Sequence, residues 1–118
     1  MRSALVALTL LLAGPVLAHT IEPREVVAYL NADRTREECG IARARQIGER
    51  SDLLLIEVND RWSRLAVSRS QRLAVEWRDM WLHAVKNGRV SIVDEKTQAP
   101  VVRYLPDGSV VVVGGSHV

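Results

Sequence analysis

Residues 61–88 constrain the fold of this chain more than any other stretch. They hold all 3 tryptophans, and apolar residues recur through their second half with the period of an α-helix. A helix over 69–86 gives an apolar line with two flanks, formed by Leu73, Trp77, Met80 and Ala84 on the line and Ala74, Trp81 and Val85 beside it. Because the chain has no phenylalanine, we expect the indoles of this helix to anchor the core.

Both ends of this helix carry sequence signals. Ser68 followed by Gln71 is a capping-box pattern at the start, and Asn87-Gly88 is typical of a left-handed stop at the end. Val75 and Leu82 fall opposite the apolar line. We therefore predict that these two residues form an outward face for a partner, or that the N-terminal helices cover them.

Residues 1–18 have the pattern of a secretory signal peptide. A basic start is followed by an apolar run over 4–13, a Gly-Pro break and small residues up to Ala18. A permanent membrane span needs roughly 20 apolar residues, so we favour a cleaved leader over an uncleaved anchor. The predicted mature chain is then a single domain over 19–118, periplasmic or secreted, with a loose tail at 114–118 and no integral membrane span.

Charge and cysteine content narrow the function classes. Sixteen Lys and Arg against fourteen Asp and Glu give a net charge of +2, which provides no long-range attraction for nucleic acid or an anionic membrane. Cys39 is the only cysteine, so no disulfide forms within one chain. We expect its thiol to be buried, with pairing to another chain and a functional thiol as the alternatives.

The N-terminal half predicts helices followed by a strand. Residues 20–31 favour a helix, although 24–30 also have strand character. A second helix is expected over 35–48. The apolar run within 52–59 predicts a central strand that is covered on both faces, with Glu57 at its wetter end.

The C-terminal part changes to a period of two. Strands are expected at 89–94, 101–105 and 109–113, with a Pro-Asp-Gly turn between the last two. The predicted fold class is α+β: a mainly antiparallel four-stranded sheet, one long helix packed on a face, and one or two shorter N-terminal helices. The crossover through the long helix allows the strand near 52–59 to run parallel to a later strand.

The valine run at 109–113 is a potential adhesive edge. An unpaired strand of this composition pairs readily with another chain. Either the N-terminal helices cover it or it pairs with another copy.

Basic side chains cluster around the predicted start of the long helix. This cluster consists of Arg61, Arg64, Arg69 and Arg72, and residues 61–72 contain no Asp or Glu. Together these arginines suggest an anion site at the helix start. A solvated basic face explains the same pattern, and it is the interpretation that we favour.

Histidines provide the second candidate site. Cleavage after Ala18 would give His19 an α-amine and an imidazole together, a pair of ligands that suits copper, with His83 or His117 as a further ligand. Asp79 lies four residues before His83, which is the spacing of a carboxylate–imidazole pair and also of an ordinary surface pair.

No short catalytic or cofactor motif occurs in the sequence. Patterns such as GxGxxG, the P-loop, CxxC, HExxH and GxSxG are missing. We therefore predict an exported, non-catalytic binding domain without a cofactor, whose partner is another envelope protein or a second copy of itself. A periplasmic copper- or other metal-binding protein that uses His19 is the alternative, and an enzyme of unknown class is the third.

Overall fold

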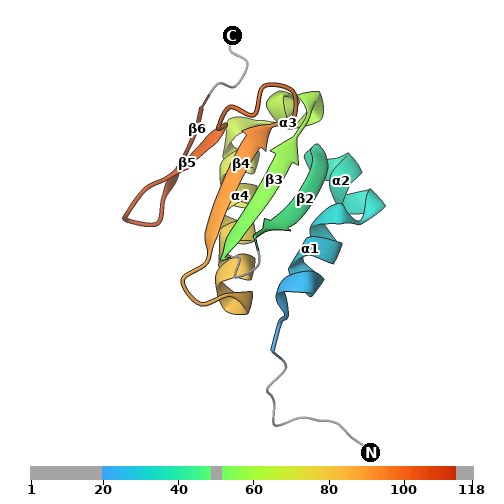
Figure 1. The fold of residues 1–118 in the computed structure, drawn as a ribbon. Helices are drawn as coiled ribbons and strands as arrows, with labels where there is room; N and C mark the ends of the chain where they lie inside the picture. Colours follow the sequence, from blue (N-terminus) through green and yellow to red (C-terminus); the bar gives the residue numbers. More distant parts are fainter. Residues whose placement is uncertain (1–19, 49–51, 114–118) are drawn as a thin grey trace, which may run out of the picture.

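A computed structural model describes residues 20–48 and 52–113 of the chain (Figure 1). Their helices and strands follow the order α1 (Pro23–Asn31), α2 (Asp33–Cys39), β2 (Ile41–Ile47), β3 (Leu53–Val58), α3 (Asp60–Arg64), α4 (Val67–Ala84), β4 (Arg89–Asp94), β5 (Val102–Tyr104) and β6 (Val110–Val112). The predicted leader and C-terminal tail lie outside the described residues. None of the described helices is long and apolar enough to cross a membrane.

The strands form a three-stranded mixed sheet and a separate two-stranded one. The larger sheet has the order β2-β3-β4, with β2 antiparallel and β4 parallel to β3, and α3 and α4 make the crossover. β5 and β6 form the antiparallel ribbon beside it (Figure 1). The α+β class and the parallel crossover are confirmed. The single four-stranded, mainly antiparallel sheet is wrong, because β2 is an additional strand and the last two strands separate from β4.

The predicted helix over 35–48 is wrong in its second half. The helix ends at Cys39, and Gly40 takes a left-handed backbone conformation (φ 78°) from which β2 begins. A Cβ at position 40 would collide with the backbone of Trp62, so glycine is also required by close packing. Ala and Arg in residues 42–45 suit a helix by propensity, but pairing with β3 overrides that preference.

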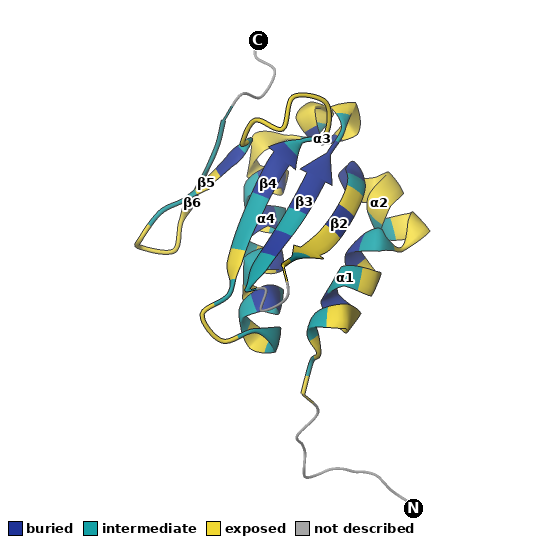
Figure 2. Ribbon diagram, viewed as in Figure 1, coloured by how far each residue is buried: buried dark blue, intermediate teal, exposed yellow. Residues whose placement is uncertain are grey.

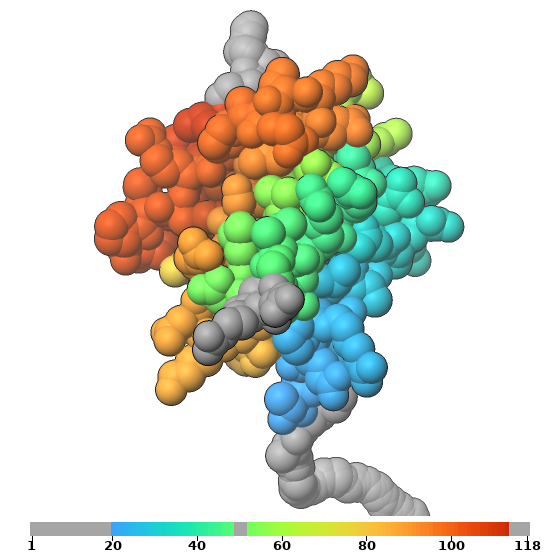
Figure 3. All heavy atoms as spheres, viewed as in Figure 1, coloured from blue at the N-terminus to red at the C-terminus, as the bar shows by residue number. Residues whose placement is uncertain are grey.

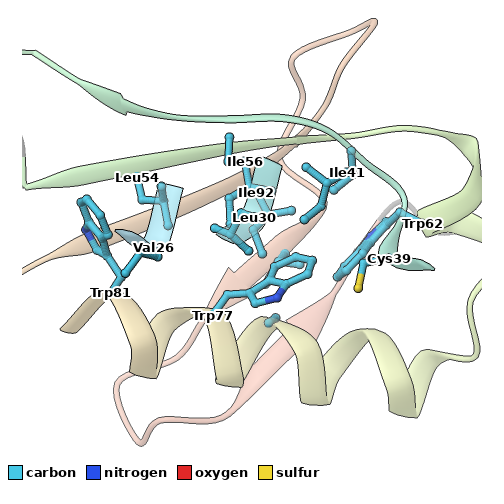
Figure 4. Close-up of a cluster of buried hydrophobic side chains, with 14 of the residues drawn as sticks. Val26, Leu30, Cys39, Ile41, Leu54, Ile56, Trp62, Trp77, Trp81 and Ile92 are labelled. Atoms are coloured by element: carbon cyan, nitrogen blue, oxygen red, sulfur yellow. The ribbon is translucent and has the colours of Figure 1, made fainter. Parts of the chain in front are cut away.

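The core lies between the sheet and one face of α4 (Figure 4). Trp77 and Trp81 point from α4 towards apolar side chains of β3 and β4, and both are at most 1% exposed. Trp62 from α3 lies beside Trp77, with 5.5 Å between the ring centroids. The indole anchors are confirmed, but the buried line runs through Ser70, Ala74, Trp77 and Trp81, so it is rotated towards one predicted flank.

Both ends of α4 differ from the predicted ones: the helix spans Val67–Ala84, and its C-cap, Val85, is extended and not left-handed. Ala66 occupies the N-cap position, and no side chain caps the helix, so the capping box at Ser68 is wrong. After the helix, Asn87 has a left-handed conformation (φ 61°), as its Asn-Gly sequence indicates. A Cβ on Gly88 would touch the indole of Trp81, which fixes the path of the chain into β4.

Partly exposed and buried residues alternate over the first half of β3 (Figure 2), so the two faces of the larger sheet are covered to different degrees. Leu54 and Ile56 point into the core and are fully buried, whereas Leu53 and Leu55 on the other face are half-buried. Glu57 lies on that second face and is only 8% exposed, so its predicted place at a wetter end is wrong. Its carboxylate accepts hydrogen bonds from Arg43 of β2 (3.1 Å) and from the Gln98 amide (2.9 Å).

Candidate functional site

A tight turn positions β6. Gly108 in this turn has a φ of 92°, and the Asp107 carboxylate accepts hydrogen bonds from the Ser109 N–H (2.9 Å) and from the Ser109 hydroxyl (2.6 Å). These bonds hold the pKa of Asp107 below its ordinary value. The turn thus sets the antiparallel pairing of β5 with β6.

One face of the β5–β6 ribbon packs against the flank of α4. The Tyr104 hydroxyl donates a hydrogen bond to the Ala74 carbonyl (2.8 Å), and the Arg78 guanidinium carbon lies 5.6 Å from the centre of the tyrosine ring. Burial raises the pKa of the Tyr104 hydroxyl. Val110, which faces Tyr104 across the ribbon, is 9% exposed. These contacts fix β6 beside the helix.

The register of the ribbon determines where the backbone of β6 points. Leu105 N–H donates to Ser109 carbonyl (2.9 Å), and Val113 N–H donates to Val101 carbonyl (2.8 Å). In an antiparallel pair, hydrogen-bonded and non-bonded residue pairs alternate, so Val111 also bonds to β5. Val110 and Val112 therefore direct their N–H and C=O groups away from β5.

The outward groups of β6 have no backbone or side-chain partner within residues 20–48 and 52–113. α1 contacts α2, α4 and β2, on the opposite side of the molecule from the ribbon (Figures 1 and 3). The N-terminal helices thus leave this valine edge uncovered.

A groove with a volume of about 590 Å³ runs along α4 beside this edge. It is lined by Gln71, Arg72, Val75, Glu76, Asp79, Ser109 and Val110. Within this lining Val75 is half-buried, while Arg72, Glu76 and Asp79 are exposed. In the described part of the chain, the side chains of these three charged residues form no ion pair. Their charges therefore remain available to a ligand.

Two of the other strand edges, those of β2 and β4, are occupied in part, whereas Val102 and Tyr104 on the outer edge of β5 also lack a backbone partner among the described residues. On β2, the Asn31 side chain accepts a hydrogen bond from the Ala44 N–H (2.9 Å) and donates one to the Ala44 carbonyl (2.7 Å). On β4, Asp94 N–H donates to the Ala99 carbonyl and Val101 N–H donates to the Ile92 carbonyl, each at 2.9 Å. The groove beside β6 and the open β6 edge together form the candidate site.

The residues predicted for a partner surface are distributed over this site and its surroundings. Val75 lines the groove, and Leu82 is half-buried on α4 outside its lining. Of the predicted basic cluster, Arg72 lines the groove and Arg61 lines a different depression. Arg69 lies near the Cys39 thiol, and Arg64 is exposed on α3.

The structure tests only part of the histidine predictions. His83 is exposed, and its Nδ1 lies 2.8 Å from the backbone oxygen of Asp79, so the imidazole bonds to the carbonyl and not to the carboxylate. His19 and His117 lie outside the described residues. Among the residues that the structure does describe, no group of 3 or more His, Cys, Asp or Glu side chains is placed to hold a metal ion.

Cys39 is buried, as its residue type predicts, at 6% exposure. Burial raises the pKa of its thiol, and the nearby Arg69 opposes that effect. A buried thiol with a raised pKa is a poor nucleophile.

The sequence contained one signal for the open edge, the valine run, but not the direction of its backbone groups. That direction depends on the ribbon register, and a slip of one residue would reverse it. Comparisons with protein-family models, with curated proteins and with solved structures found no match.

Proposed function

We propose that this protein is an interaction domain, without catalytic activity, that binds an extended polypeptide segment along β6. The observation that carries the proposal is a pair of residues, Val110 and Val112, whose backbone N–H and C=O groups point away from β5 beside a groove on α4. An extended segment bound here adds a strand to the ribbon and supplies the missing hydrogen-bond partners.

Side-chain alternation gives the bound segment two distinct faces. Every second side chain would point down onto the groove, where Val75 and Val110 offer apolar contact. Arg72, Glu76 and Asp79, which lie along one face of α4, offer charges of both signs. The proposed ligand is therefore an extended segment with apolar residues at alternate positions and mixed charge, and not a polyanion.

The chemistry of the groove supports binding and not catalysis. Ser109 contributes the only hydroxyl to its lining, and that hydroxyl bonds to Asp107 in the turn. A catalytic serine needs a neighbouring base that takes its proton. Asp107 instead serves the turn geometry.

We place this function in the cell envelope or outside the cell, on the basis of the signal-peptide pattern in residues 1–18. Copper binding through His19 remains a prediction, since both of the terminal histidines lie outside the described residues. N-terminal sequencing followed by a copper titration, with His19→Ala as the control, tests it.

A displayed library of random linear peptides tests the binding proposal. The immobilised full chain is expected to enrich peptides whose binding is lost in Val112→Pro, because proline removes an outward N–H. Val75→Asp should also weaken binding, whereas Leu82→Asp, outside the groove, should not. Thermal unfolding verifies that each variant is folded. Peptides that bind Val112→Pro and Val75→Asp as well as the original chain would show that the site is elsewhere.

A further inference from the structure

We infer that the segment that binds β6 is β6 of a second copy of this chain, paired antiparallel about a two-fold axis at Val111. This inference rests on the proposed function and names its partner. It joins the two ribbons into one continuous sheet, with an α4 helix from each copy beneath the junction.

The backbone of β6 is self-complementary in this arrangement. With Val111 on the axis, Val110 of one copy lies opposite the partner's Val112, and the reverse pair follows by symmetry. These are the residues whose N–H and C=O groups point away from β5. Each can therefore exchange hydrogen bonds with its counterpart, while Val111 occupies a non-bonded pair position.

The charges along the groove favour a second copy over an unrelated strand. Arg72 and Asp79 both line the groove and lie seven residues apart, about two helical turns. The two-fold axis makes the two α4 helices antiparallel. Arg72 of one copy then lies opposite the partner's Asp79, and the partner's Arg72 lies opposite Asp79, with Val75 near the centre.

The composition of β6 also favours strand pairing. Its edge carries valines only, without the lysine, proline or inward charge that commonly blocks edge-to-edge association. The other edges are less suitable: Asn31 occupies the outward groups at Ala44, residues 99–101 occupy part of β4, and β5 carries the charged Arg103.

A disulfide at the axis tests the geometry. Two antiparallel non-bonded residues have Cα atoms about 4.5 Å apart, which is within the range that a disulfide spans. Val111→Cys in a Cys39→Ser background should therefore form a covalent dimer of the full chain under mild oxidation. Arg103→Cys in the same background is the matched control, since this exposed residue faces Val111 from β5 and lies off the axis. Equal cross-linking of the two variants would overturn the inference.

Charge exchange tests the helix pairing independently. In sedimentation equilibrium, Arg72→Asp and Asp79→Arg should each weaken dimerisation by about tenfold or more, because each change places like charges together twice. The double variant restores opposite charges and should recover the dimer. A double variant weaker than both single variants would contradict the antiparallel arrangement.

The outcomes separate this inference from the function on which it rests. If the chain stays monomeric at all concentrations while selected peptides still bind in a Val112-dependent manner, the second copy is the wrong partner and the strand-binding function stands. If the chain is monomeric and no peptide depends on Val112, both proposals fail.

Discussion

The outer edges of β2 and β6 pose the same physical problem, and this chain solves it at one of them only. Ala44 on β2 points its N–H and C=O groups away from β3, and the Asn31 side chain bonds to both. Val110 and Val112 on β6 also point these groups outward, and no described residue bonds to them. A single amide at the end of α1 thus occupies the outward groups of Ala44.

This difference indicates that β6 lacks the protection that β2 has at Ala44. Proteins commonly protect exposed strands from pairing with other chains, and β2 has such protection. β6 instead combines an apolar sequence, a rigid position on α4 and an adjacent groove. The following predictions test each side of the comparison, beginning with the largest expected effect.

Gly40→Ala should disrupt the closed edge at its origin. The new Cβ meets the backbone of Trp62 in a left-handed conformation, so we expect a loss of about 3–5 kcal/mol in the free energy of unfolding. Gly108→Ala is the control: its φ is also positive, but no atom lies within 4 Å of its Cβ position. Urea denaturation should show a much smaller loss for Gly108→Ala. Equal losses would mean that close packing at Gly40 is unimportant.

Asn31→Ala should open the β2 edge. It leaves a partly buried donor and acceptor of Ala44 without partners, at an expected cost of about 2 kcal/mol in unfolding free energy. Asn31→Asp keeps the acceptor for the Ala44 N–H but loses the donor to its carbonyl, so an intermediate cost is expected. Denaturation measurements on the three proteins give the order. A neutral Asn31→Ala would show that this amide does not protect the edge.

The Arg43–Glu57 pair, which links β2 to β3, should make the closed side sensitive to acid. The Gln98 hydrogen bond, followed by Arg43, lowers the pKa of Glu57 in the folded state, against the opposing effect of burial. Because the folded pKa is below the unfolded value of about 4.3, this contribution is complete above that pH and is lost as the pH falls through the folded pKa.

The difference in unfolding free energy between the original chain and Glu57→Gln isolates this effect. It should be largest near neutral pH and should decrease below about pH 4. Other carboxyls with lowered pKa values, such as Asp94 and Asp107, contribute to both proteins and cancel. A difference that grows as the pH falls would contradict the assignment.

Val112→Pro should have the smallest effect on folding, because it removes an N–H that no described residue accepts. We expect a cost below about 1 kcal/mol in unfolding free energy, against about 3 kcal/mol for Val111→Pro, which removes a bond to β5. Thermal or chemical denaturation of the two variants tests the contrast. A large cost at Val112 and a small one at Val111 would show that the register is reversed.

Much of the fold could be predicted from periodicity, but the features that depend on tertiary contacts could not. The Trp77–Trp81 face and the parallel crossover follow from local pattern and from topological rules. β2 is not predictable from local pattern, because its Ala and Arg residues suit a helix and the role of Gly40 as a helix stop depends on its packing against Trp62. The Asn31–Ala44 bonds join residues that only the folded chain brings together.

The candidate site was also predicted only in part. The helical period placed Val75 on the outward side of α4, where it lines the groove. The same argument included Leu82, which lies outside the groove lining because the ribbon reaches only part of the helix. Which valines of β6 present their backbone groups depends on register, and composition does not specify register.

Amide hydrogen exchange on the full chain tests the central comparison most directly. At concentrations where the protein sediments as a monomer, the account predicts slow exchange for the Ala44 amide and fast exchange for those of Val110 and Val112. Raising the concentration should slow exchange at Val110 and Val112 and leave Ala44 unchanged. Val110 and Val112 amides that are as protected as that of Ala44 in the dilute monomer would contradict an open β6 edge.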